Sequence, residues 1–163
     1  MEPRWLKWAR RLQAISQTGL HYGKDPYDIE RFEEVQQIAA EMMAEGADEK
    51  FETMLSAFTE QTGCATPKVD VRGAVFRDGK ILLVKERVDE GWTLPGGWAD
   101  VGETPRECVE KEVFEESGFN VQATKLAAVY DRAQHPHTPP LPFDIYKLFF
   151  LREIVGGEAK PSY

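Results

Sequence analysis

The stretch from residue 104 to residue 118 carries both a start signal and a stop signal for one short helix. Thr104 and Glu107 have the spacing of a capping box, and Pro105 suits the first helical position. Gly118 supplies the left-handed residue that commonly ends a helix. Any fold that this chain adopts must therefore accommodate a helix that begins after Thr104 and ends before Gly118.

Three glutamates share one face of this predicted helix. Glu112, Glu115 and Glu116 stand at i, i+3 and i+4, so their side chains are neighbours. Each close like-charge pair should destabilise a helix by roughly 0.2–0.5 kcal/mol. A hard divalent cation such as Mg²⁺ or Mn²⁺ prefers oxygen ligands and would offset that cost. A solvated acidic face is the other interpretation.

The wider segment resembles the Nudix box, the signature of the Nudix hydrolase family. That box requires Gly, five residues, Glu, seven residues and then Arg-Glu-U-x-Glu-Glu-x-Gly-U, where U is a bulky aliphatic or aromatic residue. The chain supplies matching residues at Gly97, Glu103, Glu112, Val113, Glu115, Glu116, Gly118 and Phe119. Lys111 stands where the family has Arg. Lysine offers one flexible ammonium in place of a planar fork, so Lys111 either orients Glu103 or a neighbouring carboxylate less rigidly or is a tolerated replacement.

The resemblance implies an α/β fold, the Nudix α/β/α sandwich with a mixed sheet. It also implies that a metal-activated water attacks one phosphorus of a pyrophosphate, without a covalent intermediate. Matching positions predict that the ligands of Mg²⁺ or Mn²⁺ are Glu112, Glu115, Glu116, the most central ligand, and the carbonyl of Gly97. The predicted catalytic set is Glu103, Lys111, Glu112, Glu115 and Glu116, with Glu103 as an orienting or outer carboxylate.

The general base and the substrate-binding residues are less constrained. The base is either a box glutamate or a residue of a later loop, where the candidates are Asp131, His135 and His137. Aromatic side chains could stack on a base and arginines could contact phosphates, and Trp92, Tyr130 and Arg87 are among them. The predicted substrate-binding set is Arg72, Trp98, Arg132, His135 and Tyr146. Packing in the core or at its rim is the alternative for each aromatic residue.

Composition limits the class of protein. A hydrophobic share of 42% in 163 residues argues for a packed core rather than disorder. The net charge of −8 makes long nucleic acid an unlikely partner and requires metal ions to screen a phosphate substrate. Cys64 and Cys108 fit no metal-binding pattern, and we predict free thiols in a reducing compartment. No apolar run has the length of a membrane span and the start lacks a signal peptide, so we predict a cytoplasmic protein.

The first part of the chain predicts a small helical domain, residues 1–65. The first helix carries apolar residues at helical spacing, namely Trp5, Trp8, Leu12 and Ile15, and we expect Gly19 to end it. A second helix should start at Asp25–Pro26 and end at Gly46, and a third should run from about Asp48 to near Gly63. Membrane-surface binding by the basic first helix is an alternative to a bundle. This extension resembles that of a bacterial subgroup that includes CDP-choline and ADP-ribose pyrophosphatases, in which a homodimer is plausible.

Residues 67–163 should form the Nudix hydrolase domain. Asp78–Gly79 predicts a hairpin turn, and strand-like runs follow at residues 119–130 and 145–154. Family members usually continue with another strand and a long helix. Because this chain stops at Tyr163, we expect the C-terminal end of the Nudix fold to be missing, either because the chain is truncated or because a partner completes the fold.

Two functions from different classes follow. The first is an enzyme that hydrolyses a nucleoside diphosphate linked to another moiety, with CDP-choline or ADP-ribose as first candidates. The alternative is a nucleotide-sensing or regulatory module without turnover, and a capped-RNA role is a third possibility that the acidic charge disfavours. The three helix glutamates favour the enzyme, since a sensor has no need to keep that charge cluster.

Overall fold

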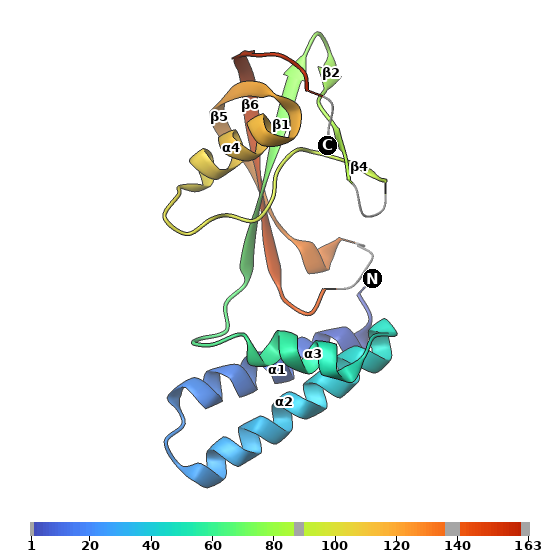
Figure 1. Cartoon of the computed structure of the whole chain (residues 1–163), viewed down its shortest axis with the longest axis vertical. Helices are drawn as coiled ribbons and strands as arrows, with labels where there is room; N and C mark the ends of the chain where they lie inside the picture. Colours follow the sequence, from blue (N-terminus) through green and yellow to red (C-terminus); the bar gives the residue numbers. More distant parts are fainter. Residues whose placement is uncertain (1, 87–89, 136–140, 161–163) are drawn as a thin grey trace. The chain divides into compact units, whose positions relative to one another are not determined.

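The computed structural model describes residues 2–86, 90–135 and 141–160, which divide into two compact units. The first unit combines Met1–Pro67 with Arg132–Asp144. The second combines Lys68–Asp131 with Ile145–Tyr163. Figure 1 shows the helices of the first unit and the sheet of the second.

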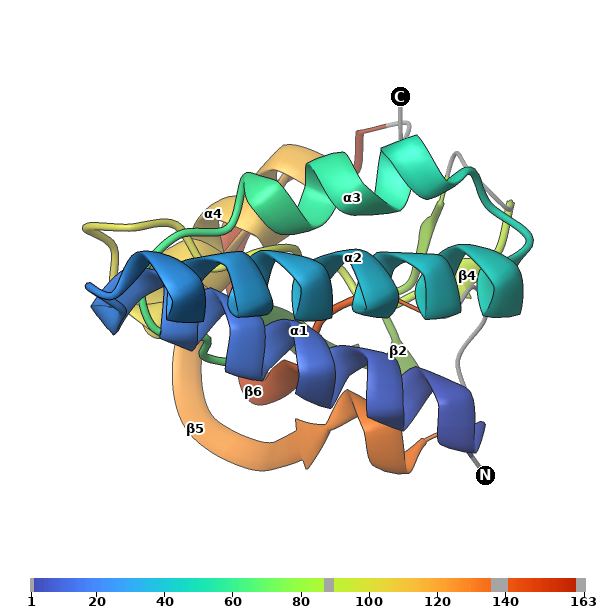
Figure 2. The ribbon, with the colours of Figure 1, turned by 90° about the horizontal axis from the view of Figure 1, so that it is seen from below.

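The first unit is a helical bundle. Its elements are α1 (Arg4–Tyr22), α2 (Pro26–Ala47), α3 (Phe51–Thr59) and a short 3₁₀ turn, η1 (Arg132–Gln134). Helix α2 lies between α1 and α3 (Figure 2). The buried residues that fill the bundle are Leu6, Ala9, Ala39, Ala40, Met43 and Phe58.

The segment 132–144 is anchored to this bundle by two contacts. The Arg10 guanidinium donates to the Leu141 carbonyl at 2.9 and 2.6 Å and pairs with Asp144 at 3.3 Å. The Phe143 ring packs edge-on against Phe58, with 6.2 Å between ring centroids. The connection between two strands of the second unit is thus part of the helical unit.

The predicted helix ends at Gly19 and Gly46 fall three residues and one residue before the observed ends, Tyr22 and Ala47. Gly19 and Gly46 lie inside α1 and α2, where each faces an aromatic ring, Phe32 and Trp5 respectively. A side chain at either glycine would overlap that ring. The glycines therefore permit close packing between helices rather than ending them.

Helix α2 begins at the predicted capping residue, Asp25, but Asp48 ends this helix and does not start the next one. Asp25 caps the start of α2 as predicted, because its carboxylate accepts from Tyr27 N–H at 3.0 Å and Asp28 N–H at 3.2 Å. Asp48, by contrast, adopts a left-handed conformation (φ 55°) and ends α2. The third helix consequently begins at Phe51 rather than near Asp48.

The apolar stripe of α1 that the sequence shows is only partly buried, because Trp5 and Leu12 pack against the bundle core while the other two residues do not. Trp8 and Ile15 are exposed, by 50% and 54%. The face that packs in the bundle instead includes Leu6, Ala9 and Ser16. Helix α1 therefore buries Leu6 together with small and polar residues, packs Trp5 and Leu12 against the core, and leaves Trp8 and Ile15 exposed.

The second unit is built on a mixed sheet. Its strands are β1 (Lys68–Arg77), β2 (Lys80–Ile81), β5 (Phe119–Asp131) and β6 (Ile145–Gly157), in the order β2-β1-β6-β5. Strand β6 runs parallel to β1 and antiparallel to β5. A separate antiparallel pair is formed by β3 (Val84–Lys85) and β4 (Trp92–Thr93). The predicted hairpin is confirmed, because Asp78 and Gly79 both have positive φ between β1 and β2.

Helix α4 (Pro105–Ser117) covers one face of the sheet. Both halves of the predicted capping box are formed between Thr104 and Glu107, and Gly118 ends the helix at φ 79°. Val109 and Val113 are fully buried against Val71 and Val75 of β1. The opposite sheet face exposes Phe76, Leu151 and Val155 among the described residues. The predicted α/β class, with a helical unit ahead of a mixed sheet, is confirmed.

The described helices include none that is both long and apolar enough to cross a membrane.

The capping box of α4 makes a measurable contribution to stability. Replacing Thr104 with Ala removes the hydroxyl that accepts from the Glu107 N–H, so we expect a loss of about 1 kcal/mol in the free energy of unfolding. Urea denaturation followed by circular dichroism measures it. The same replacement at exposed Thr66 is the control and should change stability by less than about 0.5 kcal/mol. Equal effects of the two replacements would contradict the role of the cap.

Candidate active site

The candidate site is built on an edge segment, residues 95–99, that lies along β1. Val71 N–H donates to the Gly97 carbonyl at 2.8 Å, Gly73 N–H donates to the Pro95 carbonyl at 2.8 Å, and Ala99 N–H donates to the Val69 carbonyl at 2.9 Å. Gly96 has φ 144°, and a Cβ there would overlap the Val71 carbonyl. The sheet edge therefore fixes the backbone of Gly96 and Gly97, and only glycine fits at position 96.

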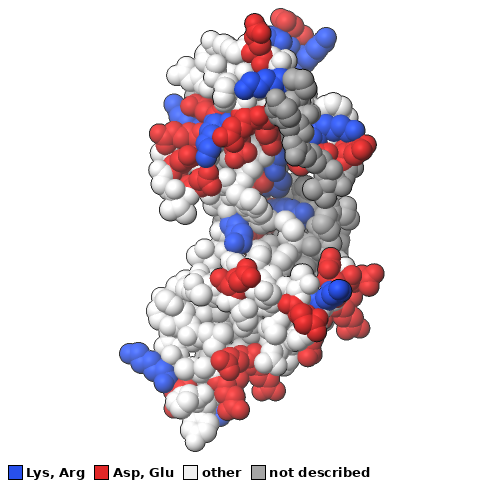
Figure 3. All heavy atoms as spheres, in the orientation of Figure 1, with Lys and Arg blue, Asp and Glu red and all other residues white. Residues whose placement is uncertain are grey.

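Two of the three helix glutamates point at this edge segment. Glu116 Oε2 accepts from the Gly96 N–H at 2.9 Å. Glu112 lies over Gly97, where a Cβ would come within 2.9 Å of Oε2. Glu115 is exposed, and Figure 3 shows acidic side chains gathered in the region of α4. The helical spacing thus brings Glu112 and Glu116 together at the edge segment, and Glu115 lies on the solvent side.

Burial raises the pKa of both carboxyl groups that face the edge segment. For Glu112, the negative charges of Glu116 and Glu115 raise the pKa further. For Glu116, burial is partly opposed by the Gly96 N–H and by the positive charge of Arg72. These groups therefore bind a proton more readily than ordinary glutamates, and a nearby cation would favour their ionised forms.

The oxygen donors fit a hard divalent cation, although a complete ligand set is not assembled. Carboxylate and carbonyl oxygens are the ligands that Mg²⁺ and Mn²⁺ prefer. The Gly97 carbonyl already accepts one hydrogen bond and keeps a second lone pair. Across residues 2–86, 90–135 and 141–160, however, no three His, Cys, Asp or Glu side chains converge closely enough to hold a metal ion.

Lys111 links α4 to the loop before it. Its ammonium donates to Asp100 at 2.8 Å and to Glu103 at 3.3 Å, and these two hydrogen bonds raise the lysine pKa above its ordinary value. The second oxygen of Glu103, Oε2, is buried and makes no hydrogen bond to any described residue. A single ammonium therefore leaves one oxygen of Glu103 unsatisfied. Asp100 was not predicted; its position inside the box, three residues before Glu103, was the available signal.

Arg72 is held beside the candidate site by a carboxylate that the sequence prediction missed. Its guanidinium makes two hydrogen bonds of 2.9 Å to Asp70 and one of 3.0 Å to the Leu94 carbonyl. Asp70 is only 6% exposed and also lies 3.8 Å from Lys147. A carboxylate between two valines at the start of a predicted strand was the signal that could have identified it.

The predicted aromatic residues lie on opposite faces of the sheet. Trp98 pairs with Asp70, whereas Tyr146 pairs with Val69, the adjacent residue of β1. Because neighbouring strand residues point to opposite faces, Trp98 and Tyr146 cannot both stack on one base. Trp98 shares its face with Arg72.

The remaining predicted residues are distributed as follows. Arg132 and His135 belong to the first unit, and Asp131 ends β5. Arg87 and His137 lie outside the described residues. Cys64 and Cys108 are free thiols, as predicted. Cys108 is a buried filler whose sulfur accepts from the Asp100 N–H at 3.3 Å, and its burial raises the thiol pKa.

Comparisons with known proteins show which family the chain belongs to. Residues 66–162 match the model of the NUDIX domain, and residues 3–58 match a UDP-X-like, N-terminal oligomerisation domain. The Bacillus subtilis protein YjhB, provisionally named an ADP-ribose pyrophosphatase, is 44% identical over 98% of this chain and 76% of its own length. The chain belongs to the Nudix hydrolase family and is a pyrophosphohydrolase of that family, which confirms the predicted family and its helical extension.

Two solved structures are also similar. The crystal structure of a UDP-X diphosphatase covers 98% of this chain and 78% of its own, with 32% identity and a TM-score of 0.55. The crystal structure of an ADP-ribose pyrophosphatase from Streptococcus suis covers 60% of this chain and 68% of its own, with 42% identity and a TM-score of 0.52.

The unsatisfied oxygen of Glu103 leads to a prediction for Lys111→Arg. A guanidinium can donate to both carboxylate oxygens, so we expect the thermal midpoint to rise by about 2 °C. Differential scanning calorimetry measures the midpoint. The same exchange at Lys125, which is exposed on β5, is the control and should leave it unchanged. A midpoint lowered by Lys111→Arg would show that the site is shaped for the shorter ammonium.

Proposed function

We propose that this chain hydrolyses the pyrophosphate bond of a nucleoside diphosphate linked to a second group, in a reaction that depends on Mg²⁺ or Mn²⁺. The observation that carries the proposal is the pair of partly buried carboxylates, Glu112 and Glu116, fixed against the Gly96–Gly97 backbone with raised pKa values. Two half-buried like charges side by side on a helix destabilise it unless a cation binds between them.

The residues of α4 and the edge segment would hold the cation. Glu112 and Glu116 are the first ligands, and Glu115 and the Gly97 carbonyl complete the proposed set. A bound divalent ion lowers the pKa of a water molecule and neutralises charge on the phosphate oxygens. Glu103 and Lys111 would support the cation site without binding the cation. The Lys111 ammonium bridges Glu103 and Asp100 and so fixes the loop that precedes α4.

Arg72 is the proposed contact for the substrate phosphates. Asp70 and the Leu94 carbonyl use three of its five N–H donors and fix its plane, which leaves two donors for a phosphate oxygen. Trp98 is 50% exposed on the same sheet face and is available to stack on a base. Arg132, His135 and Tyr146 remain in the proposed substrate-binding set, and Asp131, His135 or a box glutamate is the proposed general base.

The substrate class follows from the relatives. Their names specify ADP-ribose for YjhB and the Streptococcus suis enzyme, and UDP-X for the structural neighbour that spans nearly the whole chain. ADP-ribose and UDP-linked compounds are therefore the first substrates, and CDP-choline is a further candidate of the same chemistry.

We also propose a homodimer assembled through the helical domain, residues 1–65, with the hydrolase domain in residues 67–163. Trp8, Ile15 and Tyr22 are spaced by seven residues on one face of α1 and are exposed by 50%, 54% and 64%. Large exposed apolar patches mark interaction surfaces, and we propose that these three side chains belong to one. The description of the matching family model as an oligomerisation domain supports a second copy of this chain as the partner.

A substrate panel tests the proposed activity. The full chain is incubated with Mg²⁺ or Mn²⁺ and with ADP-ribose, UDP-linked sugars or CDP-choline, and released nucleoside monophosphate is quantified. We expect turnover of at least one compound and its loss with a chelator. Metal-dependent binding without turnover of any compound would assign the chain to the nucleotide-sensing class instead.

Replacing Glu116 with Gln tests the ligand assignment. The amide oxygen can still accept from the Gly96 N–H, so the fold should persist, whereas the lost charge should lower kcat by at least about 100-fold. The same replacement at Glu153, which is exposed on β6, should leave kcat unchanged. Equal rates for wild type and Glu116→Gln would remove Glu116 from the site.

The dimer is tested by Ile15→Glu. A charge in the centre of the exposed α1 stripe should convert the dimer into a monomer, because desolvating an unpaired carboxylate at an interface is costly. Light scattering after size-exclusion chromatography measures the mass. Val101→Glu, at a fully exposed residue of the second unit, is the control and should keep the dimer. A monomeric wild-type chain, or a dimeric Ile15→Glu variant, would contradict this interface.

A further inference from the structure

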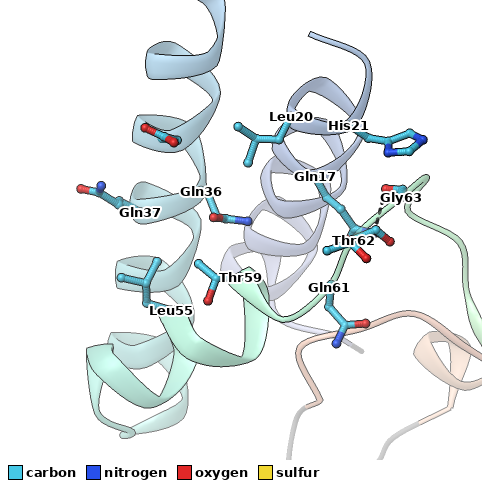
Figure 4. A pocket seen from close by; sticks show the side chains of 11 residues that line it. Gln17, Leu20, His21, Gln36, Gln37, Leu55, Thr59, Gln61, Thr62 and Gly63 are labelled. Carbon is cyan, nitrogen blue, oxygen red and sulfur yellow. Dashed lines mark hydrogen bonds between the residues drawn. The ribbon is translucent and has the colours of Figure 1, made fainter. Parts of the chain in front are cut away.

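The helical unit contains a cavity that the proposed hydrolase function does not use. It has a volume of about 540 Å³ and lies between α1, α2, α3 and the turn that follows α3 (Figure 4). Cavities of about 300–1,000 Å³ are typical of small-molecule sites. All of its lining residues belong to the first unit.

Gln17 lines one wall of the cavity, and its side-chain amide has a structural role. Gln17 donates from Nε2 to the carbonyls of Thr62 at 3.3 Å and Gly63 at 3.1 Å, and its Oε1 accepts from Gln13 at 3.2 Å. These hydrogen bonds hold the turn after α3 against α1. The amide of Gln17 therefore needs no ligand.

Gln36 on the opposite wall is different. Its side chain is only 5% exposed, its amide points into the cavity, and it makes no hydrogen bond within the described part of the chain. An apolar residue at this position of α2 would extend the adjoining core residues Ala39, Ala40 and Met43. The Gln36 amide is thus a nearly buried polar group without a partner among the described residues, at the wall of an open pocket, where it is available to a ligand.

The charge of the lining selects the ligand. Glu33 is the carboxylate and His21 the imidazole among the described lining residues, and neither Lys nor Arg is among them, so the lining offers a phosphate no permanent positive charge. Leu20 and Leu55 provide apolar surface. An amide presents a donor beside an acceptor, which matches the edge of a nucleobase. The best match is an uncharged, planar heterocycle with adjacent donor and acceptor groups.

We propose that this cavity binds a nucleoside without phosphate, with the Gln36 amide pairing with the edge of its base and Leu20 and Leu55 in contact with its ring. The site is distinct from the carboxylate pair of α4 in residues and in ligand charge. It does not depend on the proposed hydrolase function.

Calorimetric titration of the full chain with adenosine, guanosine, cytidine and uridine, in the presence of a chelator, tests the proposal. We expect saturable binding of at least one nucleoside, with one site per chain, and at least tenfold weaker binding of its 5′-monophosphate. Gln36→Leu should weaken binding at least tenfold. Gln122→Leu, the same change at an exposed residue of β5, should not.

The stability of the variant separates a binding role from a structural one. Gln36→Leu should keep or raise the thermal midpoint, because it replaces an unpartnered buried amide with an apolar side chain. If that variant does not fold, Leu20→Trp, which fills the cavity without altering Gln36, should abolish binding instead. A chain that binds no nucleoside at millimolar concentration holds only water in this cavity, and that result overturns the proposal. Undiminished binding by Gln36→Leu or by Leu20→Trp overturns it as well.

Discussion

The hydrogen bonds between β1 and residues 95–99 are the interaction on which the geometry of the candidate site depends. They hold the Gly96–Gly97 backbone in place on one side, and α4 packs Val109 and Val113 against the same strand on the other. Strand β1 thus positions both the glycine backbone and α4. For this reason the carboxylates of α4 lie next to the glycine backbone. Gly96 makes this possible, since its left-handed φ and its contact with the Val71 carbonyl exclude any side chain.

Helix caps and tight turns could be predicted from the sequence, because they depend on residues close together in the chain. The capping box at Thr104, the stop at Gly118 and the Asp78–Gly79 turn each act within a few residues, and each was found where predicted. The spacing of Glu112 and Glu116 likewise sufficed to bring these two carboxylates together, because a helix fixes which side chains are neighbours.

Contacts between distant residues were beyond sequence reasoning. Gly19 and Gly46 were predicted to end helices. Each instead lies within a helix, where the absence of a side chain leaves room for an aromatic ring of another helix. Asp70 carried a local signal, but its contact with Lys147, 77 positions away, forms only in the sheet and could not be predicted. The stripe of Trp8 and Ile15 showed the correct helical period, but periodicity alone does not tell a core face from an interaction face.

The segment 132–144 belongs to the helical unit by packing, although along the chain it connects two strands of the second unit. It is the connection of the antiparallel β5–β6 pair, and its Leu141 carbonyl and Phe143 ring complete the bundle around Arg10 and Phe58. A cut after Pro67 would divide the chain between the two matched family regions. The isolated helices would then lack their contacts with Leu141 and Phe143. Domain boundaries drawn along the sequence and boundaries drawn by packing are thus different in this protein, and fusion or domain-exchange designs must move residues 132–144 together with the helices.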